Sequence, residues 1–83
     1  PNPSARGTTV RLRLPARADV RVEVLDPQGR RIRTLATLSL DAGDHAFAWD
    51  GRDDTGASVA PGVYLVRAHS GDAEGSVRVI RAH

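Results

Sequence analysis

The stretch VRVEVLDPQGRRI, residues 20–32, decides the fold class. Its valines alternate with charged side chains, and this period of two predicts a strand with one buried and one solvated face. DPQG at 26–29 has Asp, Pro and Gly at the first, second and fourth positions of a type I turn. The segment after the turn places Ile32 inward, so the stretch predicts a strand, a turn and a second strand.

The same alternation continues on both sides of this stretch. The segments that have it are 8–15, 19–26, 30–35, 45–50, 63–69 and 76–82. Helical periodicity is missing from every window of useful length. With a further short bridging strand expected at Val59, the turn spacing predicts an all-β fold, an antiparallel β-sandwich of about seven short strands.

The chain has 83 residues, which is enough for one hydrophobic core but not for two. Residues 1–7, PNPSARG, are polar and rich in proline, so we expect a linker or a strand that leads into a single domain over residues 8–83. The sequence has no cysteine, which excludes disulfides and thiolate metal sites, and its formal net charge is only +2. No apolar run is long enough to span a membrane, and no signal peptide is visible. Because the chain opens with PNP rather than methionine, we expect a processed product or a piece of a longer protein.

The densest stretch is WDGRDDTGASVAPGVY, residues 49–64, in which three aspartates and an arginine fall within six residues. A calcium loop of the helix–loop–helix kind that began at Asp50 would need an oxygen ligand at its third position and glycine at its sixth. Those positions hold Arg52 and Thr55, so the pattern fails, although a cation in the 50–56 loop stays open. The sequence favours turn geometry over a metal site.

The same stretch supplies residues for turns and for the core. Trp49 is expected to anchor the core at a strand end, and Asp53 and Gly56 stand at the first and fourth positions of a tight turn. Pro61 and Gly62 suit the middle of a type II turn that leads into the next strand. The predicted structural residues are Trp49, Asp50, Gly51, Asp53, Gly56 and Pro61.

The sequence contains no recognisable catalytic or metal-binding motif. The clustered aspartates lie in one loop, with no second lobe to build a cleft for paired carboxylates. His45, His69 and His83 lack the spacing of a zinc site, and no serine stands in a GxSxG motif. RRIR at 30–33 is the one basic cluster and lacks aromatic residues that stack on bases, while the three aromatic residues suit the core better than a sugar platform. We therefore expect no catalytic residue, no cofactor, no metal ligand, no nucleic-acid partner and no small-molecule substrate.

Longer segments resemble bacterial C-terminal immunoglobulin-like modules. PNPSARGTTVRLRLP at 1–15 is similar to their opening motif, and VRVEVLDPQGRRIRTL at 20–35 to the segment that follows. LDAGDHAFAWDGRDDTGASVAPGVYLVR at 40–67 is similar to their most specific part, and SVRVIRA at 76–82 to their closing strand. Two related groups share these motifs: the immunoglobulin-like domain of the flagellar hook-cap protein and the C-terminal sorting domain of type IX secretion cargo. The resemblance implies an immunoglobulin-like antiparallel β-sandwich.

The two groups imply different roles. The PNP opening, the GVY motif and the basic last strand favour the sorting domain, which implies a non-catalytic module for secretion, sorting or cell-surface anchoring at the end of a larger secreted protein. By resemblance, its sorting-related residues are Gly62, Tyr64, Arg78, Val79 and Arg81. The alternative is a structural assembly module, hook-cap-like or a subunit of an extracellular filament, that uses β-strand edges for protein contacts. The expected partners are secretion machinery, a parent protein domain or copies of the chain itself, and the expected location is extracellular or at the cell surface.

Overall fold

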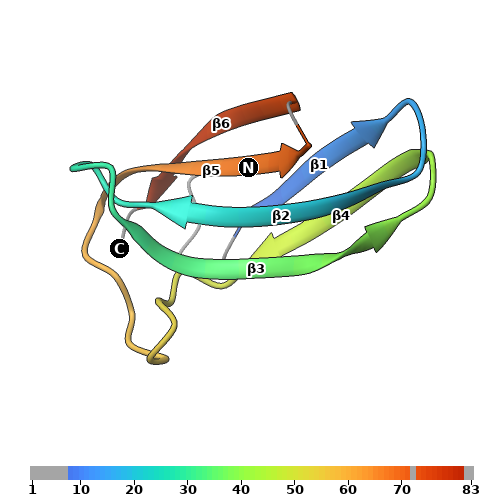
Figure 1. Ribbon diagram of the computed structural model, residues 1–83. Helices are drawn as coiled ribbons and strands as arrows, with labels where there is room; N and C mark the ends of the chain where they lie inside the picture. Colours follow the sequence, from blue (N-terminus) through green and yellow to red (C-terminus); the bar gives the residue numbers. More distant parts are fainter. Residues whose placement is uncertain (1–7, 72, 82–83) are drawn as a thin grey trace.

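Six antiparallel β-strands form the part of the chain that the structure describes (Figure 1). This computed structural model describes residues 8–71 and 73–81, and the linker or lead-in strand expected at residues 1–7 lies outside that part. In chain order the strands are β1 (Thr8–Leu14), β2 (Ala18–Leu25), β3 (Arg31–Leu40), β4 (Gly43–Trp49), β5 (Gly62–Ser70) and β6 (Ala73–Arg81). The all-β class is confirmed, and the described residues include no helix that could cross a membrane.

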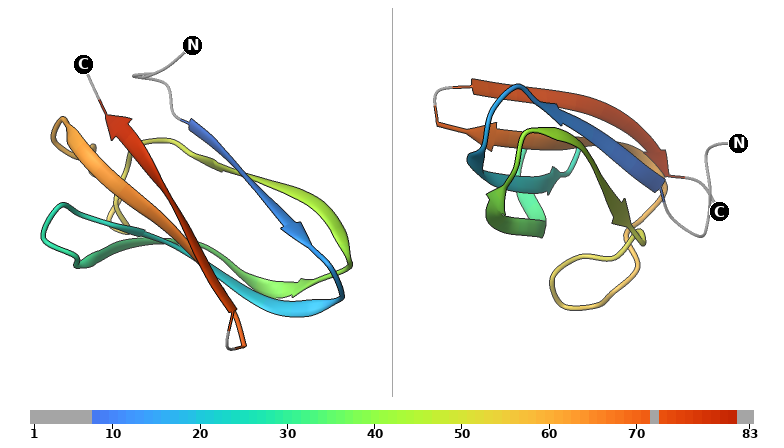
Figure 2. Two further views of the ribbon diagram at one scale, coloured as in Figure 1. Left: turned by 90° about the horizontal axis from the view of Figure 1, so that it is seen from above. Right: turned by 90° about the vertical axis from the view of Figure 1, so that its right-hand side faces the viewer.

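The strands form two sheets that pack against each other. β1 pairs with β4, and the larger sheet has the order β3-β2-β5-β6, with every pairing antiparallel. The two views of Figure 2 show the two-stranded sheet lying across the inner face of the larger sheet. The antiparallel β-sandwich predicted from the alternation is confirmed.

The hairpin between β2 and β3 contains the tight turn expected at DPQG. The N–H of Gly29 donates to the carbonyl of Asp26 at 2.8 Å. The Asp26 carboxylate accepts the N–H groups of Gln28 and Arg30, each at 2.9 Å. The hydrogen bond from the Arg30 amide is the main cause that lowers the pKa of Asp26 below its ordinary value.

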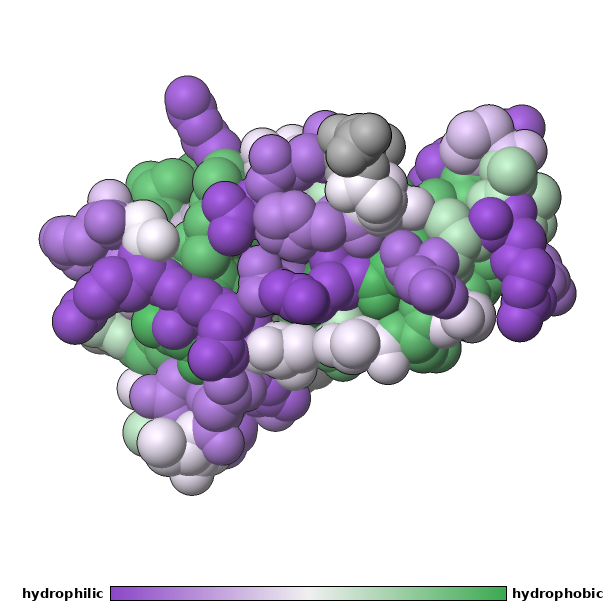
Figure 3. Space-filling model, in the orientation of Figure 1, coloured by the Kyte–Doolittle hydropathy of each residue, from purple (hydrophilic) through white to green (hydrophobic). Residues whose placement is uncertain are grey.

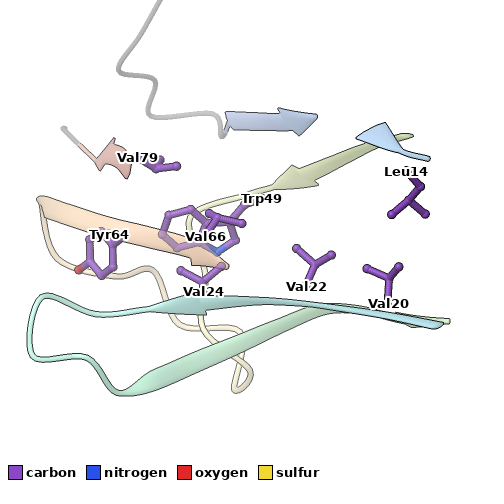
Figure 4. Close-up of a cluster of buried hydrophobic side chains, with 8 residues drawn as sticks. All are labelled: Leu14, Val20, Val22, Val24, Trp49, Tyr64, Val66 and Val79. Atoms are coloured by element: carbon purple, nitrogen blue, oxygen red, sulfur yellow. The ribbon is translucent and has the colours of Figure 1, made fainter. Parts of the chain in front are cut away.

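A buried apolar core fills the space between the two sheets (Figure 4). Its members are the inward-facing side chains of strands along which successive side chains point to opposite faces, as the period of two requires. They are Leu14, Val20, Val22, Val24, Trp49, Tyr64, Val66 and Val79. The rings of Trp49 and Tyr64 meet edge to face with centroids 5.4 Å apart, so the two largest side chains of the core hold β4 against β5.

Two expectations about strand boundaries are wrong. The segment around Val59 contains a single bridge between Arg52 and Ser58 rather than a strand. In addition, β3 continues through Leu40, beyond the expected end at residue 35, because its second half pairs with the first half of β2. The described residues therefore contain six strands where about seven were expected.

Candidate functional site

The stretch that begins at Trp49 forms a compact loop between β4 and β5. The Trp49 indole Nε1 donates to the carbonyl of Arg52 at 2.9 Å, and the Asp50 carboxylate accepts the N–H of Arg52 at 3.0 Å. Gly51 lies between them, is buried, and has a φ of +78°, which favours glycine. These contacts fold the first half of the loop back onto the core.

Asp53 organises the second half of the loop. Its Oδ1 accepts the hydroxyl of Thr55 at 2.6 Å and the N–H groups of Thr55 and Ala57 at 2.9 and 3.1 Å. The hydroxyl bond is the largest cause that lowers the pKa of Asp53 below its ordinary value. The N–H of Gly56 closes the turn on the Asp53 carbonyl at 3.0 Å. One oxygen of this carboxylate, Oδ1, accepts all three of these bonds within the turn. No three His, Asp or Glu side chains in residues 8–71 and 73–81 are grouped to hold a metal ion.

The same loop covers the outer edge of β3. The N–H of Asp54 donates to the carbonyl of Ile32 at 2.9 Å, and the Asp54 carboxylate accepts the N–H of Thr34 at 3.1 Å. Two arginines of β3 add side-chain contacts: Arg31 donates to Asp54 at 2.9 Å, and Arg33 to the carbonyl of Arg52 at 3.0 Å. Asp54 therefore substitutes for a neighbouring strand at Ile32 and Thr34. The sequence does not indicate this role, because Asp54 and Thr34 are 20 positions apart.

The end of the loop differs from the expected type II turn. The third position of such a turn needs a positive φ, and Gly62 does not have one. Instead, Gly62 begins β5 and pairs with Arg81. The hydroxyl of Tyr64 donates to the carbonyl of Ala60 at 2.6 Å, which ties Ala60 and Pro61 back to the strand that follows them.

The five residues assigned to sorting by resemblance lie in different environments. Tyr64 and Val79 belong to the core, and Gly62 is half-buried. The Arg81 side chain passes so close to Gly51 that a Cβ on this glycine would lie 2.2 Å from Arg81 Nε. Arg78 is the one member of the five with an exposed side chain. The five residues therefore do not form one exposed recognition surface.

A charged cluster that the sequence did not indicate lies on the outer face of the larger sheet. Glu23 is 5 % exposed, although the alternation of β2 assigns it to the solvated face. Its carboxylate lies 3.4 Å from the guanidinium of Arg67 and 3.2 Å from Nε2 of His69, both on the neighbouring β5. Figure 3 shows this face, with hydrophilic side chains across its middle. The long side chains around Glu23 bury it, and only the register of β2 with β5 could have indicated the cluster.

The opposite edge of the larger sheet, β6, has no such cover in the described part of the chain, where it pairs with β5 alone. Beneath this edge, between the two sheets, lies a mostly apolar groove of about 160 Å³. Gly75 and Val77 of β6 form one rim, Val10 and Leu12 of β1 the other, and Phe47 contributes to the lining. An uncovered edge beside an apolar groove is suited to protein contacts rather than to chemistry.

Comparisons with known proteins agree with this geometry. The family model described as FlgD Ig-like domain matches residues 2–74. The basal-body rod modification protein FlgD of Salmonella typhimurium and its namesake in Salmonella typhi are each 42 % identical over 47 residues, which is 57 % of this chain and 20 % of theirs. The solved structure of FlgD from P. aeruginosa is 27 % identical with a TM-score of 0.72, and the match covers 89 % of this chain and 57 % of that one. The chain therefore spans about a fifth of the length of the curated relatives.

These matches support one of the two resembling groups and correct the expected location. They support the hook-cap immunoglobulin-like domain, whereas they give no support to the type IX sorting domain. The expected extracellular or cell-surface location is wrong, because the family model and the relatives are FlgD proteins and the curated relatives are named for basal-body rod modification.

Proposed function

The chain belongs to the FlgD Ig-like domain family, and on this premise we propose that it is a non-catalytic structural module in flagellar hook assembly. The family match over residues 2–74 is the observation that carries the proposal. In this proposal residues 8–83 act as one domain whose partners are other proteins of the assembly. The assembly alternative thus replaces the secretion and anchoring role that the last strand had favoured.

The geometry of the loop supports a structural role. Asp53 is engaged in its own turn, and Asp54 covers the edge of β3, so neither carboxylate is directed toward a substrate cleft. In the proposal, Trp49 and Gly51 belong to the framework that holds this loop, and Arg78 is part of the surface that meets other proteins. Contacts through sheet edges and side chains require no cofactor.

A chimera tests the proposal in cells. The whole immunoglobulin-like domain of Salmonella typhimurium FlgD that contains the 47-residue match is replaced by this chain, and the chimera is expressed in a strain that lacks FlgD. We expect hooks in electron micrographs and swimming in soft agar. Two controls accompany it: FlgD with the domain deleted, and the chimera with Trp49→Ala, which removes the largest core side chain.

Two outcomes would contradict the proposal. One is a chimera that accumulates to the level of FlgD and yet forms no hooks. The other is a deletion control that forms hooks as well as the chimera does, because the module would then be dispensable. Immunoblots of the three proteins separate these outcomes from a failure of expression.

A further inference from the structure

The two edges of the larger sheet differ in how their backbone groups are hydrogen-bonded. Along β3, the 50–56 loop occupies the carbonyl of Ile32 and the N–H of Thr34. Along β6, from Glu74 to Val79, the described residues provide a partner on the β5 side alone. An edge with unused N–H and C=O groups is a template for another strand. Among residues 8–71 and 73–81, β6 is therefore the edge that no loop covers, whereas the loop covers β3 at Ile32 and Thr34.

The inner side of this edge has a gap next to a protruding side chain. A Cβ built on Gly75 meets no atom within 4 Å, so the groove wall is open at this position. Two residues along the same face, Val77 is 46 % exposed although it lies on the groove rim. When two such strands run in opposite directions side by side, the apolar side chain of each strand can lie opposite the gap of the other.

The outer side of the edge has opposite charges with matching spacing. Glu74 and Arg78 are both exposed and stand two positions on either side of Ser76. The contacts of Glu74 with Arg67 and His69, at 3.2 and 3.5 Å, both involve its Oε2. Its Oε1 can therefore accept a second arginine without loss of these contacts.

We propose that two copies of the chain pair through β6, antiparallel, about a twofold axis at Ser76. In this register Glu74 of each copy lies opposite Arg78 of the other, and Val77 of each copy lies opposite Gly75 of the other. The two pairs occur twice, once on each side of the axis, as an isologous interface requires. The proposal rests on the proposed function, which it deepens by naming a second copy as one partner.

Neighbouring registers lack this complementarity. A shift of one residue places inward side chains opposite outward ones, which the pleat of a sheet forbids. A twofold axis at Val77 would place Glu74 opposite Ile80 and leave Gly75 without Val77. The axis at Ser76 satisfies the charges and fills the gap at once.

Cross-linking tests the register directly, since the sequence has no cysteine of its own. Ser76→Cys places two thiols opposite each other across the axis, where Cβ atoms lie about 4.5–5.5 Å apart. Val63→Cys is the matched control, because Val63 is 49 % exposed on the same sheet but lies on β5. We expect Ser76→Cys to form covalent dimers at least about tenfold faster than the control under mild oxidation. Equal rates would overturn the proposed pairing.

Charge exchange tests the contacts in the purified chain by analytical ultracentrifugation. Arg78→Glu places like charges opposite Glu74, and Glu74→Arg places like charges opposite Arg78, so we expect each variant alone to associate about tenfold more weakly than the parent chain. An equimolar mixture restores two opposite pairs, and we expect it to associate as the parent does. Circular dichroism of each variant verifies the fold, and a mixture no tighter than its components would refute the register.

Gly75→Val tests the gap. The added side chain has open space in its own copy, but it fills the space into which Val77 of the other copy would pack. We expect an unchanged melting temperature and association weakened at least about tenfold, and unchanged association would contradict the proposal. A parent chain that stays monomeric at high concentration would also overturn it. In that case hooks formed by the chimera would leave the proposed function standing, whereas dimers without hooks would refute the function alone.

Discussion

Gly51→Ala should destabilise the fold for two separable reasons. Gly51 has a φ of +78°, and an L-residue in this left-handed region costs about 1–2 kcal/mol. Its new Cβ would also lie 2.2 Å from Nε of Arg81, so the guanidinium must move away. The lost contacts of that side chain add about 1 kcal/mol, the size of one hydrogen bond. We therefore expect a total loss of about 2–3 kcal/mol in the free energy of unfolding.

Gly56→Ala is the matched control, because both glycines have a positive φ and only Gly51 lies against Arg81. Gly56 also has a positive φ, +91°, but a Cβ on it meets no atom within 4 Å. We expect this variant to lose about 1–2 kcal/mol, the conformational part alone. In a domain of this size, the loss at Gly51 corresponds to a fall of about 10–20 °C in melting temperature.

A double-mutant cycle with Arg81→Ala separates the two reasons. Urea unfolding followed by circular dichroism gives the free energy for each single variant and for each pair. With the arginine removed, Gly51→Ala should cost no more than Gly56→Ala, and Gly56→Ala should cost the same in both backgrounds. If Gly51→Ala costs as much without Arg81 as with it, the close approach of the guanidinium is irrelevant to the choice of glycine.

Three further perturbations probe the core, the turns and the covered edge. Trp49→Ala should cost about 3–5 kcal/mol, a large part of a typical domain stability, and calorimetry should show a strongly lowered or missing transition. Hydrogen bonds lower the pKa values of Asp26 and Asp53 below 3.8 in the folded state. The two carboxylates therefore contribute their full stabilisation of the fold well above pH 3.8, and this contribution is lost as the pH falls through the pKa values of the folded state. The urea midpoint should therefore fall in acid, and less steeply when both residues are asparagine; equal slopes would contradict this assignment. Asp54→Ala removes the acceptor for the N–H of Thr34, which should cost about 1 kcal/mol and raise light scattering from edge-to-edge association; unchanged scattering would show that the edge is protected otherwise.

Alternation predicted strands well where buried and exposed side chains alternate, as in β1, β4 and the first half of β2. The period-two valines of β2 lie in the core, and the turn at Asp26 closes as its residue types indicate. The boundaries were harder to predict. β3 extends to Leu40 because it pairs with β2, and no local signal in its second half specifies that pairing.

The long-range contacts could not be predicted from the sequence. Glu23 belongs to the solvated face by pattern, and its burial depends on Arg67, 44 positions away. In the same way, the close approach of Arg81 to Gly51 depends on the fold, which brings the two residues together. Local spacing identified the loop as a turn, but its contacts with β3 and β6 arise from the packing of the whole sandwich.

The acidic loop has a consequence for assembly that a metal site would not have. A sheet with two open edges can add copies at both sides without limit, whereas a sheet with one covered edge stops after a single pairing. The hydrogen bonds of Asp54 cover the β3 edge at Ile32 and Thr34, so we expect the proposed pairing through β6 to give a closed pair of sheets rather than a fibre. If this reasoning holds, Asp54→Ala should convert dimers into larger species, and Asp54→Ala combined with Gly75→Val should not form them through β6. Dimers that persist unchanged in Asp54→Ala would show that the Asp54 carboxylate does not limit the assembly.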